Sequence, residues 1–161
     1  YVVALDAGHG GSDVGAEGVI QEVELTERTV DELFALLEQD PNYTPVRCRE
    51  NGENATSGER ALKAAEAKAS LLLSIHGNSD PYSEDSYGFE CYPQPPGRVH
   101  HESALSFAQV IASQFGEAGQ RLRGENGVRY IYYQGSGTQM ALLSQVGDNI
   151  QLSGMVAVNE F

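Results

Sequence analysis

The stretch Tyr1-Val2-Val3-Ala4-Leu5-Asp6-Ala7-Gly8-His9-Gly10-Gly11 opens the chain and decides its architecture. Its first six residues form a short apolar run closed by Asp6, and three glycines follow within the next five positions. This pattern predicts a buried β-strand that ends in a glycine-rich loop. His9 lies in that loop, just beyond the predicted strand.

A second apolar run, Leu71-Leu72-Leu73-Ser74-Ile75, repeats this arrangement further along the chain. His76 and Gly77 follow it at once, just as Gly10 follows His9. An apolar run without polar alternation is typical of a central strand that is buried on both faces. If the two strands are parallel neighbours, both imidazoles lie at the same edge of the sheet.

Helical and extended patterns alternate along the rest of the chain. Apolar residues at helical spacing predict a helix over residues 24–38, and Thr56 and Glu59 stand at capping-box spacing before an Ala-rich helix that runs to residue 68. A third helix is expected at residues 103–115, and further strands at residues 44–49, 87–92, 128–133 and 155–158. Residues 134–154, rich in Gly, Ser and Gln, are expected to form an inserted hairpin or loop. The alternation predicts one α/β domain over residues 1–161, a single mixed, mostly parallel sheet with helices on both faces.

The formal net charge of the 161-residue chain is -13. Such a surface repels nucleic-acid phosphates, so no DNA or RNA partner is expected. It also repels anionic wall polymers at long range, so an anionic substrate must be held by local groups such as a metal ion or a few arginines. No apolar run reaches the length of a membrane span. The chain begins inside a predicted strand without a signal peptide, so we expect a mature or trimmed domain.

The two cysteines, Cys48 and Cys91, each lie in an apolar, strand-like context. One possible pair in a chain of this size is not a disulfide framework. Both are therefore predicted to be buried thiols. A disulfide between them, or a role as a third metal ligand, is the alternative.

The chain has four histidines, and two of them follow predicted strands. Two imidazoles at one edge, joined by a carboxylate from an adjoining loop, would form a three-ligand site. Zinc held in this way keeps a fourth position for water, which hydrolysis needs. On spacing alone, two hydrogen-bonded loop histidines explain the pattern equally well. The other pair, His100 and His101, is expected at an exposed helix start, with a substrate-contacting loop as the alternative.

The first motif, continued through Ser12-Asp13-Val14-Gly15-Ala16, resembles the opening motif of the zinc-dependent N-acetylmuramoyl-L-alanine amidases, the type 3 amidases among cell-wall hydrolases. Ser74-Ile75-His76-Gly77-Asn78-Ser79 resembles that family's second histidine motif. Arg49-Glu50 and Glu59-Arg60-Ala61 stand where the family has similar pairs. The resemblance runs in order from residue 2 to about residue 92, and more weakly to residue 133. It implies a zinc ion held by two histidines and a glutamate.

The glutamate ligand of that family lies in the loop just before the first helix, and Glu22 fits this position. Glu17 and Glu24 are its rivals. Glu24 fits better in the first helical turn, where a carboxylate interacts favourably with the helix dipole. The metal ligands that the resemblance implies are therefore His9, Glu22 and His76.

The resemblance implies hydrolysis of the amide between the lactyl group of N-acetylmuramic acid and L-alanine in peptidoglycan. It also implies a glutamate on the last strand as general base. Glu160 is the only candidate and matches poorly, so we expect this base beyond Phe161, in a C-terminal strand and helix that the chain lacks. The alternative function is a non-catalytic, zinc-containing peptidoglycan-binding module without the base. A zinc peptidase is a weaker possibility, because the chain has no His-Glu-x-x-His motif.

The same resemblance implies a secreted, autolysin-like protein. It would act outside the cell, in the cell wall or in the periplasm, with peptidoglycan as its partner. Further wall-targeting domains are expected in the full protein.

Overall fold

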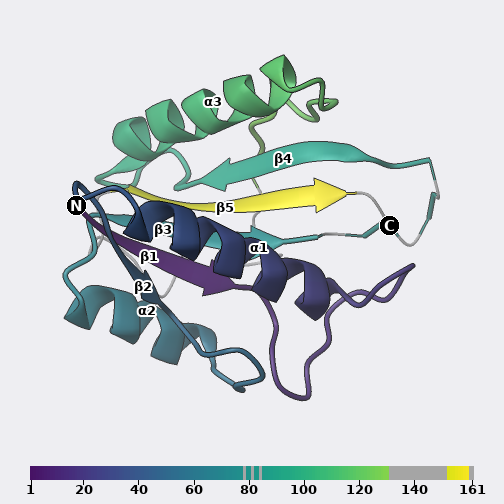
Figure 1. Cartoon of the computed structure of the whole chain (residues 1–161). Helices are drawn as coiled ribbons and strands as arrows, with labels where there is room; N and C mark the ends of the chain where they lie inside the picture. The colour runs from purple at the N-terminus through teal and green to yellow at the C-terminus, as the bar shows by residue number, and fades with distance from the viewer. Residues whose placement is uncertain (78, 81, 84, 131–151, 160–161) are drawn as a thin grey trace.

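The chain forms a parallel core sheet to which one antiparallel strand is added (Figure 1). The structure, a computed structural model, describes residues 1–77, 79–80, 82–83 and 85–130 and the backbone of residues 152–159. Its elements are β1 (Val2–Ala7), α1 (Glu22–Glu38), β2 (Thr44–Arg47), α2 (Ser57–Glu66), β3 (Leu71–His76), β4 (Gly88–Pro93), α3 (His101–Glu117) and β5 (Leu152–Asn159). The described strands form a five-stranded sheet in the order β2-β1-β3-β5-β4. Only β4 among them runs antiparallel, against β5.

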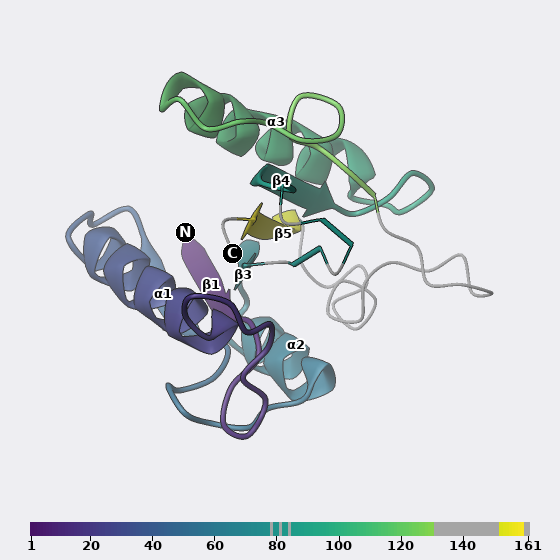
Figure 2. The ribbon, with the colours of Figure 1, turned by 90° about the vertical axis from the view of Figure 1, so that its right-hand side faces the viewer.

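Helices cover both faces of the sheet, as the sequence predicted. Val30 of α1 and Ala108 and Ala112 of α3 pack on one face, in a cluster with Leu5, Ile75 and Phe89. Ala61 and Ala64 of α2 pack on the opposite face, in a cluster with Ala4 and Leu72. Figure 2 shows α1 and α2 on opposite sides of β1 and β3. We call these the α1/α3 face and the α2 face.

Local sequence signals account for the helix boundaries. Thr56 accepts a hydrogen bond from the backbone N–H of Glu59, whose side chain in turn accepts one from the Thr56 backbone, so the predicted capping box is confirmed. The α1 and α3 helices extend two residues before their predicted starts. Among the described helices, none combines the length and apolar character that a membrane crossing requires.

The last strand lies in the interior of the sheet. The predicted strand at residues 155–158 is confirmed and extends over β5, which pairs in parallel with β3 and antiparallel with β4. The prediction of a strand at residues 128–133 is wrong for its described part, because Val128 forms only isolated bridges, with Cys91 and Glu125. The remainder of that strand, the insertion predicted up to residue 151, and Glu160 lie outside the described residues.

Both cysteines are buried free thiols, as predicted. The disulfide alternative is wrong, because Cys48 belongs to the apolar cluster on the α2 face and Cys91 to the cluster on the α1/α3 face. Burial raises the pKa of each thiol to about 12, so neither is an ionised sulfur ligand near neutral pH.

Candidate metal centre

Two histidines meet at the carboxyl edge of the sheet. The β1 and β3 strands are parallel neighbours in which Ala7 pairs with Ile75, so the residues that follow them emerge side by side. The rings of His9 and His76 lie 5.0 Å apart between centroids and nearly perpendicular, at 79°. The predicted convergence of the two imidazoles is therefore present.

Glu22 joins the two histidines through both of its carboxylate oxygens. Oε2 lies 3.0 Å from Nε2 of His9, and Oε1 lies 3.1 Å from Nδ1 of His76. One donor atom from each residue lies within 4.8 Å of the others, so the three could hold one metal ion. We call them the His9–Glu22–His76 group. Among the described residues, no other His, Cys, Asp or Glu cluster meets this geometry.

The position of Glu22 corrects one expectation from the sequence. It is the first residue of α1 and not part of the preceding loop, because the helix begins directly after its N-cap residue, Gln21. The start of a helix suits a carboxylate, since the helix dipole is positive there. Glu24 lies in the first helical turn, as predicted, and neither Glu24 nor Glu17 belongs to the group.

Backbone N–H groups fix the orientation of the Glu22 carboxylate. The N–H of Ala16 donates to Oε2 at 2.9 Å, and the N–H of Gly77 donates to Oε1 at 2.9 Å. On the far side of the His9 ring, Nδ1 lies 3.0 Å from the carboxylate of Asp13. A carboxylate at Nδ1 favours the tautomer that presents Nε2 as a metal ligand. Asp13 was not predicted as a site residue, although its place in the first motif offered a signal.

Two glycines make room for the rings. A Cβ atom at Gly8 would lie 2.4 Å from Cε1 of His76, and one at Gly15 would lie 2.6 Å from Cδ2 of His9. Gly15 also has a φ of +69°, which side-chain-bearing residues rarely adopt. The glycine-rich pattern therefore serves both the backbone turn and the space for the imidazoles.

Gly8→Ala is expected to weaken metal binding at the group by more than about tenfold, because the new methyl group must displace the His76 ring from Glu22. Titration of the chelator-treated protein with zinc measures the affinity. Gly116→Ala, the same change within α3, is the control and should leave the affinity unaltered. Equal affinities for the wild type and Gly8→Ala would show that metal binding does not require the His76 ring in the place that it occupies next to Gly8.

Two buried arginines hold the loop that carries His9. Arg49 donates from Nε to the carbonyl oxygen of Ala7 at 2.8 Å, and from Nη2 to that of Gly8 at 3.2 Å. Arg60 donates to the carbonyl oxygens of Ala7, at 2.7 Å, and of His9. These contacts stabilise the loop where His9 adopts an unusual positive φ of 63°. The sequence identified both arginines only as family-like pairs and gave them no role.

The charges of the group are strongly coupled. Burial opposes ionisation of Glu22, but the hydrogen bonds with His76 and His9 and from the two backbone N–H groups outweigh it and hold its pKa well below the usual range. The hydrogen bond with Glu22 is the main reason that the pKa of His9 is raised, and Asp13 adds to it against the effect of burial. Glu22 is thus an anion at any physiological pH, ready to bind a cation.

The raised pKa of His9 predicts opposite pH trends with and without zinc. In chelator-treated protein, its stabilising contribution is complete below the ordinary value of 6.5 and is lost as pH rises through the raised pKa. Zinc needs the deprotonated imidazole, so the stabilisation by zinc should grow between pH 6 and pH 8. Melting temperatures with chelator and with zinc measure both trends. His9→Gln should flatten them, and an unchanged pH dependence in that variant would contradict this assignment.

The other two histidines lie apart from the group. His100 is the N-cap residue of α3 and His101 its first residue, so the predicted helix start is confirmed. Both are half-buried and not exposed as predicted. For His101 the reason is that Nδ1 donates to the carbonyl oxygen of Gln94 at 2.7 Å and the ring lies near Tyr130.

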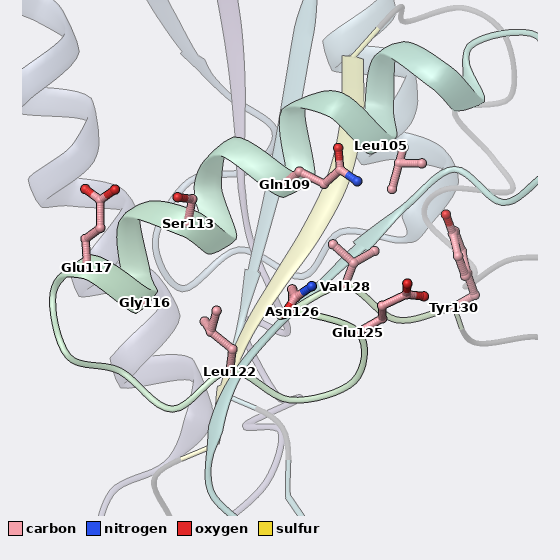
Figure 3. A pocket seen from close by; sticks show the side chains of 10 residues that line it. All are labelled: Leu105, Gln109, Ser113, Gly116, Glu117, Leu122, Glu125, Asn126, Val128 and Tyr130. Carbon is pink, nitrogen blue, oxygen red and sulfur yellow. The ribbon is translucent and has the colours of Figure 1, made fainter.

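A surface hollow lies elsewhere on the molecule, between α3 and residues 122–130 (Figure 3). Its volume is about 740 Å³, and polar side chains such as Gln109, Ser113 and Glu125 line it. No member of the His9–Glu22–His76 group reaches it. The convergence of donor atoms, and not the size of a hollow, therefore locates the candidate centre.

The sheet, the two strand-end histidines and the helix-borne glutamate define an α/β protein with a candidate metal centre at the carboxyl edge. The profile of the N-acetylmuramoyl-L-alanine amidase family matches residues 3–145. The chain belongs to this family.

Individual relatives agree with the family match. The chain is 39% identical over 80 residues to the probable N-acetylmuramoyl-L-alanine amidase AmiB of Haemophilus influenzae. The aligned region covers 48% of this chain and 18% of that protein. It is 35% identical over 92 residues to the endolysin of Bacillus phage SPP1, and this alignment covers 56% of this chain and 33% of the endolysin. The chain thus spans only a minor part of these two relatives.

Solved structures share the fold. The catalytic domain of CwlV, an N-acetylmuramoyl-L-alanine amidase from Paenibacillus polymyxa, superposes with a TM-score of 0.76 at 27% identity, over 97% of this chain and 78% of that one. Ami1 from Mycobacterium smegmatis superposes with a TM-score of 0.78 at 20% identity, over 98% of this chain and 81% of that one. At this identity the similarity shows the fold alone.

Proposed function

We propose that residues 1–161 form the catalytic domain of a zinc amidase that hydrolyses the amide between the lactyl group of N-acetylmuramic acid and L-alanine in peptidoglycan. The observation that carries this proposal is the convergence of His9, Glu22 and His76 in a chain of the amidase family. Similarity to the CwlV catalytic domain supports it.

The donor set fits zinc. Two imidazole nitrogens and one carboxylate oxygen are ligands that zinc prefers, and a catalytic zinc site uses three protein ligands. Glycines at positions 8 and 15 leave the space that both rings need. When bound, zinc would supply a Lewis acid that polarises the lactyl carbonyl and lowers the pKa of water.

The residues of the chain prepare this centre in three ways. Glu22 supplies the negative charge and is kept ionised by its four hydrogen-bonding partners. Asp13 holds the His9 ring through Nδ1, and the N–H of Gly77 links Glu22 to the end of β3. Arg49 and Arg60 fix the loop backbone between β1 and His9. Ligands fixed in advance lose little entropy when the metal binds.

Hydrolysis of a purified muropeptide by the full-length protein, with and without a chelator, tests the proposal. We expect release of the peptide with a new L-alanine amino terminus, loss of this activity in chelator, and its recovery with zinc. His76→Ala should be inactive, whereas His100→Ala, outside the group, should retain activity. Activity that survives both zinc removal and His76→Ala would refute the zinc mechanism. Zinc and muropeptide binding without hydrolysis would identify a non-catalytic wall-binding module.

We further propose that the protein acts outside the cell or in the periplasm as a secreted, autolysin-like enzyme. Membership of a cell-wall amidase family supports this location, because peptidoglycan lies there. Additional wall-targeting domains in the full protein would bring the amidase domain to its polymer.

A further inference from the structure

A buried carboxylate on β4 holds two arginines from a segment that follows α3. The side chain of Glu90 is fully buried, and its Oε1 lies 2.8 Å from Nη1 of Arg123 and 2.7 Å from Nη1 of Arg129. Its Oε2 accepts a hydrogen bond from the hydroxyl of Tyr92. Two guanidinium groups therefore converge on one carboxylate, so these three side chains together carry more positive than negative charge. We call Arg123 and Arg129, held together by Glu90, the Glu90–arginine pair.

Glu90 lies on the same face of the sheet and at the same level as His76. In the sheet register, His76 pairs with Ala157 of β5, and Ala157 pairs with Glu90 of β4. Neighbouring residues Ile75 and Cys91 both point to the α1/α3 face, so His76 and Glu90 point to the α2 face. Two strand spacings of about 4.8 Å separate them, a lateral distance of roughly 10 Å.

A second link connects the pair to the loop that follows His76. The pKa of Asp80 in this loop is lowered, chiefly by the hydrogen bond from Ser86 and also by the positive charge of Arg123. The Arg123 side chain is thus close to the loop that leads from the candidate centre to β4. The side chain of Arg123 is 24% exposed and that of Arg129 is 41% exposed, so both reach solvent.

Backbone contacts already hold the arginine segment to β4. The N–H of Phe89 donates to the carbonyl of Arg121 at 2.7 Å, and the N–H of Arg123 donates to that of Phe89 at 3.0 Å. Further along, the N–H of Arg129 donates to the carbonyl of Cys91 at 3.0 Å. One arginine would be enough to neutralise Glu90. Attachment of this segment to β4 therefore does not explain why a second arginine binds the same carboxylate.

The chemistry of the pair points to an anionic ligand. Each guanidinium offers five N–H donors in a planar fork suited to carboxylates, and one nitrogen of each is directed at Glu90. Among the described residues, neither guanidinium forms an ion pair with any carboxylate other than Glu90. In a chain of net charge -13, a local cationic pair is what an anionic substrate needs.

We propose that Arg123 and Arg129, oriented by Glu90, bind a carboxylate of the stem peptide on the L-alanine side of the scissile amide. The inference rests on the proposed function. An extended peptide advances about 3.3–3.6 Å per residue, so the lateral distance of roughly 10 Å between His76 and Glu90 matches the span of two to three residues of the stem. This pair would then select stem peptides that carry free carboxylates over amidated ones.

Calorimetric binding of the product peptide to the zinc-loaded full-length protein tests this without turnover. One probe is an L-alanyl tripeptide with free carboxylates on its second and third residues, and the other is the same peptide with both as carboxamides. We expect the acid form to bind at least about tenfold more tightly, as hydrogen bonds to charged groups predict. Equal affinities, or no binding of either peptide, would overturn the inference.

Arg129→Gln should weaken binding of the acid peptide much more than binding of the carboxamide peptide, so that most of this discrimination is lost. Arg28→Gln makes the same charge change at an exposed α1 position and should preserve the discrimination. Equal weakening of both peptides in Arg129→Gln would indicate only a structural role and overturn the inference. Muropeptide hydrolysis is measured separately. An active protein without discrimination refutes only this subsite, whereas an inactive zinc-loaded protein refutes the proposed function.

Discussion

Replacing Glu22 with glutamine is expected to abolish amidase activity and to cause a large loss of zinc affinity. The variant keeps the size of the side chain but removes the anion that lies 3.0 and 3.1 Å from the two imidazoles. The loss should exceed the roughly 10–100-fold typical when only an outer hydrogen-bonding partner of a ligand is removed. Zinc titration and muropeptide hydrolysis measure the two effects.

Asp13→Asn is the matched comparison for Glu22→Gln. It makes the same acid-to-amide change on the far side of His9, where the well-exposed Asp13 contacts Nδ1 of the ring and not Nε2, which faces Glu22. We expect zinc affinity to fall by about tenfold, the lower end of the range for such partners. If Asp13→Asn weakened zinc more than Glu22→Gln, Glu22 would not be the principal anionic ligand.

Arg60→Met is expected to destabilise the fold by about 3–5 kcal/mol, the usual cost of removing one partner of a buried ion pair. Nη1 of Arg60 lies 2.9 Å from the carboxylate of Asp6, which is itself buried. The substitution also deprives the carbonyls of Ala7 and His9 of their donor. The free energy of unfolding in urea, measured in chelator so that zinc does not contribute, gives the effect.

Arg28→Met provides the control for Arg60→Met. Arg28 pairs with Glu32 on the surface of α1, where both side chains are largely exposed, and such pairs contribute about 0–1 kcal/mol. If Arg60→Met lowered the free energy of unfolding by less than about 1 kcal/mol, Arg60 would not be needed to stabilise the loop that carries His9. A large loss in both variants would point to a general effect of removing positive charge.

The sheet edge was predictable because its signals are local. An apolar run followed by a histidine and a glycine occurs twice, and parallel pairing of β1 and β3 necessarily brings His9 and His76 together. The capping box before α2 was equally local. Both patterns depend on backbone periodicity and turn chemistry, which short segments encode.

Other features depend on long-range packing and could not be read from the sequence. The starting residue of α1 decides whether Glu22 lies in a loop or a helix, and Gln21 is not a strong N-cap signal. The interior position of β5 depends on its pairing with both β3 and β4. The arginines at positions 49 and 60 reach the loop across more than 40 residues of sequence, a contact that no local pattern reveals.

Zinc content of the purified full-length protein, measured by elemental analysis before any chelator treatment, tests the central claim most directly. The arrangement of His9, Glu22 and His76 predicts close to one zinc ion per chain in the wild type and a large deficit in Glu22→Gln. Folded wild-type protein that carries only a small fraction of one zinc per chain, and takes up none when it is offered, would contradict the account.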